Sequence, residues 1–443
     1  MVGFRDREDS TTRARRLLDY LSAQGEFDRG DLGGIRLWLQ NLDSDQELSD
    51  EQWRPIADQL RKQGEVDLAN AVYDRIERAA DDVLRDVATV LAERQELTSP
   101  WVVLVGAGGS KPEPTNIPLV SELLPLLWER ASNVNAKHLL QLQEQCERLG
   151  IRNIEDLLTA LDLARTAAGN PRLRQLVESL LGSTDVVRGR PTNTARVGDP
   201  GLTERLSETT QTLFSLLIGV MRNALPNDFH RSLATRATGD DFSIITTNYD
   251  VCIERALSGV NPYYYSGVSE STVGTPILKL HGSLNWFACS SCDEVVAASL
   301  DNINQLVSMR LFPVVSQCPE CASLAPHLIV PPVGVKLAEH PTLLEIRQAS
   351  EVALKAAKVI AVAGYSFSEA DEYVLKMISR AVADSERRIL VFDQSREPSR
   401  RLAAFLKAHA RGYRAAEYVT PIVGDVNQLF PEFVEAWTTA RAG

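Results

Sequence analysis

Long apolar segments are absent from this sequence of 443 residues. The longest apolar stretches, Trp101–Val105 and Val359–Ala363, have only the length of a β-strand. A helix that crosses a bilayer needs about 20 consecutive apolar residues, so none is expected here. The first residues, Met1–Arg16, also lack the apolar run of a secretory signal peptide. The sequence therefore predicts a cytoplasmic protein without membrane spans.

Lysine is scarce, with 9 residues against 38 arginines, and the formal net charge is −12 at pH 7. Nucleic acids and anionic membranes bind basic surfaces. The acidic balance therefore argues against either as the main partner, including nucleic acid bound through a zinc ribbon. Hydrophobic residues make up 44% of the chain and charged residues 24%, which is usual for a globular protein. The length suggests two or three domains.

Cysteine is also rare, and four of the six cysteines form two closely spaced pairs. Cys289 and Cys292 make the first CxxC pair, and Cys318 and Cys321 make the second. Two such pairs supply the four thiolates of a tetrahedral zinc site, which then has no open position for water. We therefore expect a structural Zn²⁺. A redox-active dithiol is less favoured, because it does not explain two pairs at this spacing. The other two cysteines are expected in the core.

The first 95 residues have a helical pattern. The clearest helix carries apolar side chains on one face at spacings of four and seven. These side chains are Leu68, Val72, Ile76, Val83, Val87 and Leu91. We expect an N-terminal helical domain at residues 1–95. It either packs on its neighbour as a bundle or serves as an adaptor for oligomers or a partner protein, and the pattern fits both.

From residue 96 to residue 443 the pattern indicates a second domain built from strands and helices. Its short apolar runs are residues 101–105, 242–247, 359–364 and 388–393, each followed by a turn and a helical pattern. Strands that alternate with helices predict an α/β fold with a parallel sheet, whose ligands gather at the carboxyl ends of the strands. The long segment between the first two runs predicts a helical insertion at about 119–234.

A glycine-rich turn, Gly106–Ser110, follows the first predicted strand. Small residues let backbone N–H groups approach a pyrophosphate closely, and Ser110 can donate a further hydrogen bond. An ordinary tight turn looks similar, and Lys111 stands where a dinucleotide fingerprint has its third glycine. Taken alone, this turn is weak evidence for dinucleotide binding.

Polar side chains follow the later predicted strands as well. Asn248 and Asp250 come after the second run, and a helix cap explains one of them more easily than both. His281 follows a short apolar segment; a lone histidine is more often structural, but imidazole is the usual general base near neutral pH. Gly364–Ser366 is a small turn with a hydroxyl group, and Asp393 offers a carboxylate of the kind that holds ribose hydroxyls.

The order of these features resembles the sirtuin-like (silent information regulator) family over about residues 98–435. That order is GAGGS, TTNYD, KLHGS, the two CxxC pairs, GYS and VFD, with the cysteines directly after the histidine. The resemblance implies a Rossmann-type parallel sheet with an inserted helical lobe and a zinc ribbon, here at about 286–330. It also implies that NAD⁺ binds in the cleft between these parts.

The resemblance assigns roles to single residues of this chain. It implies that Asn248 and His281 are catalytic, Asn248 by holding the nicotinamide ribose or a water and His281 as the base. The implied NAD⁺-binding residues are Gly106, Ala107, Gly108, Ser110, Thr247, Asp250, Gly364, Ser366 and Asp393. Gly424-Asp425 resembles the segment near the adenine. The implied zinc ligands are Cys289, Cys292, Cys318 and Cys321.

Three departures separate the chain from the family's protein deacylases. The loop at 110–115 has a different sequence, Thr247 stands where deacylases carry Gln, and residues 329–336 lack the element that lines an acyl-lysine groove. The Pro-Pro…Lys pattern at 329–336 is similar to a branch of sirtuin-like proteins that consume NAD⁺ in bacterial antiviral defence.

We therefore expect an NAD⁺ glycohydrolase that yields nicotinamide and ADP-ribose. Because free activity would deplete NAD⁺, we expect control by a homo-oligomer, a partner protein or a phage-derived trigger. An NAD⁺-dependent protein deacylase and a non-catalytic sensor of NAD⁺ or ADP-ribose are the alternatives.

Overall fold

The computed structural model describes the chain from residue 100 to residue 442, with gaps. The described residues are 100–133, 137–152, parts of 154–161 and 213–221, then 223–237, 242–269, 272–289, 291–300, 315–329, 340–368, 371–382, 387–409 and 419–442. The predicted domain at residues 1–95 and nearly all of the segment at 329–336 lie outside the described residues.

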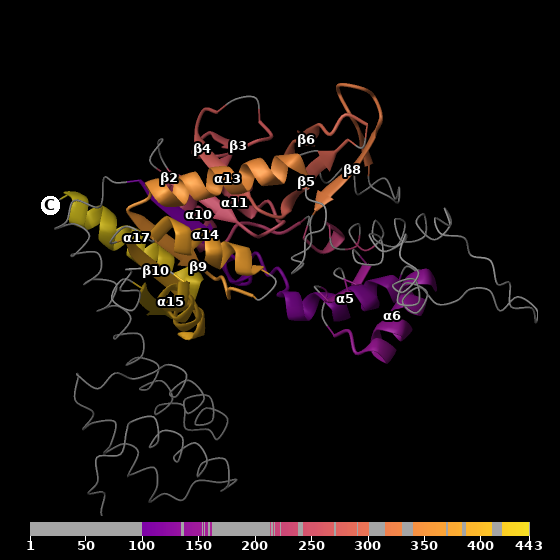
Figure 1. The fold of residues 1–443 in the computed structure, drawn as a ribbon, viewed down its shortest axis with the longest axis horizontal. Helices are drawn as coiled ribbons and strands as arrows, with labels where there is room; N and C mark the ends of the chain where they lie inside the picture. The colour runs from indigo at the N-terminus through magenta and orange to yellow at the C-terminus, as the bar shows by residue number, and fades with distance from the viewer. Residues whose placement is uncertain are drawn as a thin grey trace, which may run out of the picture.

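Seven parallel strands form the main sheet, in the order β11-β10-β9-β1-β2-β4-β3 (Figure 1). Their bounds are β1 Trp101–Val105, β2 Phe242–Thr246, β3 Tyr263–Tyr265, β4 Thr275–Lys279, β9 Val359–Ala363, β10 Arg388–Asp393 and β11 Val419–Val423. Every residue of β1 and of β9 is buried, as expected for strands covered on both faces. The predicted parallel α/β fold is confirmed.

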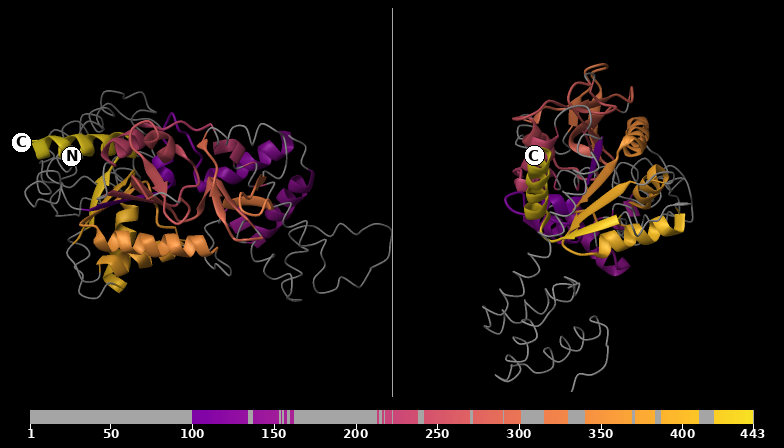
Figure 2. Two further views of the ribbon diagram at one scale, coloured as in Figure 1. Left: turned by 90° about the horizontal axis from the view of Figure 1, so that it is seen from above. Right: turned by 90° about the vertical axis from the view of Figure 1, so that its left-hand side faces the viewer.

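Helices cover both faces of this sheet (Figure 2). They are α10 Asp228–Arg236, α11 Cys252–Leu257, α13 Pro341–Ala356, α14 Glu372–Val382, α15 Glu397–His409 and α17 Val426–Ala442. α10 packs on α11 and α17, whereas α14 packs between α13 and α15. α10 lies at the end of the range expected for the helical insertion. Its buried Phe229 and Leu233 nevertheless belong to the core around the sheet.

A separate helical core lies beside the sheet. It contains α5 Val120–Asn133 and α6 Lys137–Leu149, which pack together and lie away from the sheet helices in Figure 1. Leu127, Leu139 and Cys146 are buried in this core, together with Cys252 from the sheet domain. The two cysteines outside the CxxC pairs are therefore core residues, as expected.

A second, smaller sheet is antiparallel and has the order β6-β5-β8-β7. Its strands are β5 Gly282–Ala288, β6 Val295–Ala297, β7 Val315–Gln317 and β8 Leu324–Ile329. The four CxxC cysteines lie on the turns of this sheet. No helix in the part of the chain that the structure describes is both long and apolar enough to span a membrane.

Candidate functional site

The strand order places one cavity at the carboxyl edge of the sheet. β1 is followed by β2 on one side and flanked by β9 on the other, so the direction of chain progression reverses at β1. Such a reversal leaves a crevice outside the carboxyl ends of the strands. A cavity of about 530 Å³ lies there. Predicted site residues that line it are Ala107, Gly108, Ser110, Thr247, Asn248, Asp250, His281, Gly364, Ser366 and Asp393. The helical core contributes Leu123 and Met221 to the same cavity.

Two glycine turns meet at the floor of this cavity because β1 and β9 are neighbours. The Gly108 N–H donates to the carbonyl of Gly364 at 2.8 Å. Gly364 has φ +59°, and a Cβ there would lie 2.2 Å from the backbone nitrogen of Gly109. A side chain at this position is therefore excluded. Gly106 does not line the cavity, but its carbonyl accepts a hydrogen bond from Asn248.

Asn248 is held in one orientation. Its Nδ2 donates to the Gly106 carbonyl at 3.1 Å and to Ser110 Oγ at 3.1 Å. A carbonyl can only accept, so the nitrogen and not the oxygen of the amide faces β1. Both amide hydrogens are then used, which leaves Oδ1 of this cavity-lining side chain as an acceptor for a ligand hydroxyl or water.

Ser110 is the centre of the network behind Asn248. It is fully buried, and its hydroxyl donates to Asp250 Oδ2 at 2.9 Å. Asp250 Oδ1 accepts from the Cys252 N–H at 2.9 Å. The side chains of Ser110 and Asp250 thus bond inside the protein. The expectation that the Ser110 hydroxyl donates to a phosphate differs from this arrangement, because Asp250 already takes its hydrogen.

His230, which the sequence reasoning missed, completes this network. Its Nδ1 accepts from the Asn227 N–H at 3.3 Å, so neutral His230 carries its proton on Nε2, 3.2 Å from Ser110 Oγ. Burial lowers the pKa of His230 to about 4, which keeps it neutral. The only signal in the sequence is the capping box formed by Asn227 and His230 at the start of α10.

His281 reaches the same cavity from the end of β4. Its side chain is 2% exposed, and Nε2 lies 2.9 Å from the Tyr373 hydroxyl and 3.0 Å from Asp371 Oδ1. Asp371 also lines the cavity, and both partners lie at the start of α14. The sequence reasoning did not use these two residues, although polar side chains after a strand end were the signal that singled out Asn248.

Gly282 turns the chain immediately after His281. It has φ +82°, a left-handed conformation that glycine adopts without strain, and a Cβ would lie 2.1 Å from the Leu328 carbonyl oxygen of β8. Beneath the site, Lys279 and Glu254 form a fully buried ion pair at 2.9 Å. The same ammonium group donates to the Asp250 carbonyl, so it links β4 to the turn that carries Asp250.

The opposite end of the cavity is acidic. Asp393 and Asp425 both line it, at the ends of β10 and β11. Burial raises the pKa of Asp393, and its Oδ1 accepts from the Ser395 N–H at 3.1 Å. Lys111 lines the cavity as well and is paired with Glu122 at 2.6 Å. The carboxylates suit sugar hydroxyls, and the Lys111 ammonium is a cation within the same cavity.

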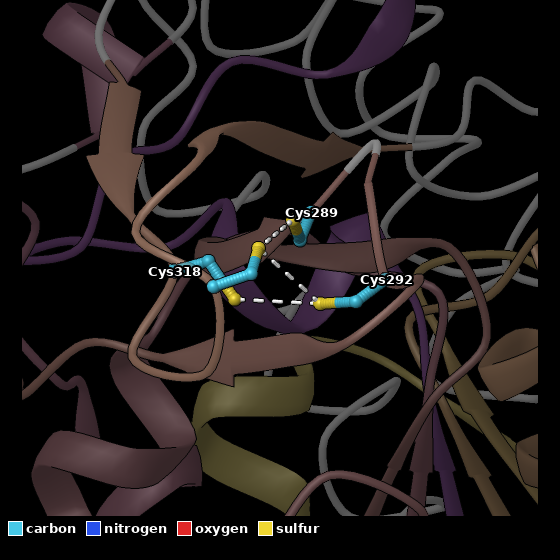
Figure 3. A group of neighbouring side chains, drawn as sticks. Cys289, Cys292 and Cys318 are labelled. Atoms are coloured by element: carbon cyan, nitrogen blue, oxygen red, sulfur yellow. Dashed lines mark hydrogen bonds between the residues drawn. The ribbon is translucent and has the colours of Figure 1, made fainter.

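The four CxxC cysteines form one cluster (Figure 3). Cys289 lies 3.4 Å from Cys321 between sulfur atoms, and Cys292 lies 3.5 Å from Cys318 and 3.7 Å from Cys321. Zn–S bonds of about 2.3 Å in a tetrahedron place the sulfurs about 3.8 Å apart, so the arrangement fits zinc closely. This cluster can hold a metal ion.

A second group of possible metal ligands consists of His230, Asp250 and Cys252. Its ligand atoms are already hydrogen-bonded: His230 to Asn227 and Ser110, and Asp250 to Ser110 and Cys252. We therefore interpret this group as part of the polar network behind Asn248.

Comparisons with known proteins gave one family match and several similar solved structures. Residues 243–422, from β2 into β11, match the SIR2-like domain family model. A comparison with curated proteins returned no match. A solved structure concerned with the mechanism and regulation of Sir2 enzymes is similar at a TM-score of 0.43 and 16% identity, covering 82% of this chain and 99% of that one. Two ADP-ribose complexes of Sir2 homologue mutants give TM-scores of 0.40 and 0.39 at 17% identity, covering 79% and 78% of this chain and 96% and 95% of theirs. Residues 243–422, which make up less than half of the chain, are therefore similar to a SIR2-like domain.

Proposed function

We propose that this protein cleaves the bond between nicotinamide and ribose in NAD⁺ and releases nicotinamide and ADP-ribose. One observation carries the proposal: Asn248 and His281, from the ends of two strands, line the same cavity as the two glycine turns and Asp393. Asn248 and His281 lie at one end of this cavity, and the backbone of the two glycine turns lies in the middle. Carboxylates lie at the other end. In this order, the three features suit the nicotinamide ribose, the pyrophosphate and the adenine ribose of a dinucleotide.

In the proposed reaction, the protein mainly has to position the sugar and the attacking group. Cleavage of the bond passes through an oxocarbenium-like state, and nicotinamide leaves as a neutral group. The Asn248 oxygen holds a ribose hydroxyl or the attacking water, and His281 accepts a proton from one of them. Positioning of reacting groups and proton transfer to a base are the two contributions expected here. Asp250 acts through Ser110, which fixes the Asn248 amide.

The test is incubation of the full chain with NAD⁺, with and without an extract of phage-infected bacteria, followed by separation of nicotinamide, ADP-ribose and cyclic ADP-ribose. We expect His281→Ala and Asn248→Ala each to lower nicotinamide release by about 10²–10⁴-fold. His409→Ala, an exposed histidine on α15, is the matched control and should behave like the parent. Release of nicotinamide at the parent rate by both site variants would refute the proposal.

Two other outcomes lead to the alternatives. Formation of O-acyl-ADP-ribose from an acetyl-lysine peptide would indicate an NAD⁺-dependent deacylase. Calorimetric binding of NAD⁺ or ADP-ribose without turnover, with a trigger present, would indicate a sensor. The deacylase is less favoured because of the loop departures at 110–115 and 329–336.

We further propose that the cysteine cluster holds a structural Zn²⁺. Four sulfurs at tetrahedral spacing fill its coordination positions, and the buried Phe287 and Ala325 pack around Cys289 and Cys318. Metal analysis should find about one zinc per chain. Cys292→Ser should lose the zinc, whereas Cys146→Ala, in the helical core, should retain it.

We also propose that turnover is controlled, as in the antiviral branch that the sequence resembles. The N-terminal helical domain expected at residues 1–95 is the candidate for oligomerisation or partner binding. Cellular NAD⁺ should stay constant when a bacterial host expresses the full chain and fall after phage infection. The His281→Ala variant should abolish that fall. Depletion without infection would refute the control.

A further inference from the structure

The start of α14 brings two polar side chains to His281. Asp371 Oδ1 lies 3.0 Å from His281 Nε2, and the Tyr373 hydroxyl lies 2.9 Å from the same nitrogen. The side chains of His281 and Asp371 are only 2% and 5% exposed. Water therefore screens this contact little, and the position of one proton decides whether it is attractive.

The carboxylate sets the position of that proton. An ionised carboxylate only accepts hydrogen bonds, so an Nε2 that carries hydrogen is attracted to it and an Nε2 with a lone pair is repelled. With hydrogen on Nε2, the Tyr373 oxygen can accept a hydrogen bond from it, and the charge on Asp371 Oδ1 attracts the same N–H group. The geometry therefore favours the tautomer of neutral His281 that is protonated on Nε2.

The other ring nitrogen is then the acceptor. Neutral imidazole has one N–H and one lone pair, so Nδ1 carries the lone pair. Among the contacts of the described residues, none involves His281 Nδ1, and the side chain lines the cavity. Nδ1 is thus the atom of His281 that is left for a ligand.

Neighbouring groups hold the two partners in place. The Asp371 N–H donates to the Ser368 carbonyl at 3.0 Å. The Arg347 guanidinium of α13 lies 4.1 Å from the centre of the Tyr373 ring, a favourable cation–π contact. The pair therefore belongs to the packing of α13 on α14.

We propose that Asp371 and Tyr373 are positioning residues that keep His281 protonated on Nε2 and so leave Nδ1 as its proton acceptor. The role in turnover rests on the proposed function: a ribose hydroxyl or water gives its proton to Nδ1. The tautomer itself does not rest on it. A similar carboxylate–imidazole contact orients the base of serine hydrolases.

¹⁵N NMR of histidine-labelled full chain tests the tautomer directly. The His281 signals are identified as those missing from His281→Gln, and we expect the Nε2-protonated form in the parent. Asp371→Asn keeps the shape, but its amide can donate as well as accept, so both tautomers should be populated. Glu372→Gln is the matched control, because Glu372 is exposed and pairs with Lys376; it should retain the parent spectrum.

Kinetics give the second readout. Asp371→Asn should lower kcat for NAD⁺ by about 10²-fold, within the range for a disabled base, and change KM by less than about threefold. Tyr373→Phe should lower kcat less, because Asp371 remains. Nδ1-protonated His281 in the parent would overturn the proposal, and so would Asp371→Asn with unchanged spectrum and kcat. Nε2-protonated His281 in a parent that does not cleave NAD⁺, even when an extract of phage-infected bacteria is added, would refute the proposed function and support the positioning role.

Discussion

The two ends of the cavity are built in different ways. At the end with Asn248 and His281, side chains from distant segments hold each other: Ser110 and Asp250 are 140 residues apart, and His281 and Tyr373 are 92 apart. At the other end, Asp393 and Asp425 each accept from the backbone N–H two residues later. The first end therefore depends on the whole fold, whereas the second is made by local turns.

Loss of the buried Lys279–Glu254 ion pair should have the largest effect of these changes. This pair lies at the end of the cavity that contains Asn248 and His281. Lys279→Met leaves the buried Glu254 carboxylate without its ion-pair partner, although the Tyr265 hydroxyl still donates to it, so we expect the free energy of unfolding to fall by about 3–5 kcal/mol. Urea unfolding measures it. Lys376→Met removes an exposed pair with Glu372 and should cost at most about 0.5 kcal/mol. Equal losses of unfolding free energy in the two variants would contradict a larger stabilising contribution from the buried ion pair.

Lowering the pH should decrease the free energy of unfolding through His230, which belongs to the network behind Asn248 at the same end of the cavity. Its pKa is lowered from 6.5 to about 4 in the folded state. The unfolded chain therefore binds a proton first as pH falls through 6.5, and the free energy of unfolding decreases until about pH 4. The shift corresponds to a loss of about 3 kcal/mol.

The measurement is urea unfolding of parent and His230→Gln between pH 7 and pH 4. The stability of the variant should fall less than that of the parent by this amount. His409→Gln, on the surface of α15, should follow the parent curve. Parallel curves for the parent and His230→Gln would contradict the buried neutral state of His230.

A backbone change tests how His281 is placed. Gly282→Ala puts a Cβ against the Leu328 carbonyl at a positive φ, so we expect a loss of about 1–3 kcal/mol in unfolding free energy and reduced nicotinamide release. Gly259→Ala is the control, because a Cβ there meets no atom within 4 Å. Nicotinamide release at the parent rate by Gly282→Ala would mean that His281 does not need this turn.

The smallest effect is expected at the local end. Asp393→Asn should raise KM for NAD⁺ by about tenfold, because a hydrogen bond to a charged group contributes about 1.5–3 kcal/mol. kcat should change little, since Asp393 lies at the end of the cavity away from Asn248 and His281. Steady-state kinetics with NAD⁺ measure both constants. A loss confined to kcat would contradict the division of the cavity into a binding end and a reacting end.

The two ends also differ in how far the sequence predicted them. Asp393 and the glycine turns could be found because a strand followed by a turn has a local pattern. His230, Asp371 and Tyr373 could not be assigned a role from pattern alone, because their partners lie on other elements. The role of Ser110 was predicted as a direct ligand contact, and its burial behind Asn248 depends on the packing of α10.

The sequence by itself determined the parallel α/β fold, the four strands at 101–105, 242–247, 359–364 and 388–393, and the four cysteines that cluster. These follow from hydrophobic runs, turn residues and ligand spacing, which act over a few residues. Only the tertiary structure decided which atoms of Asn248 and His281 are available to a ligand. Hydrogen bonds to Ser110 and Tyr373 and the charged contact with Asp371 decide it, and those contacts exist only after the sheet and its helices have packed.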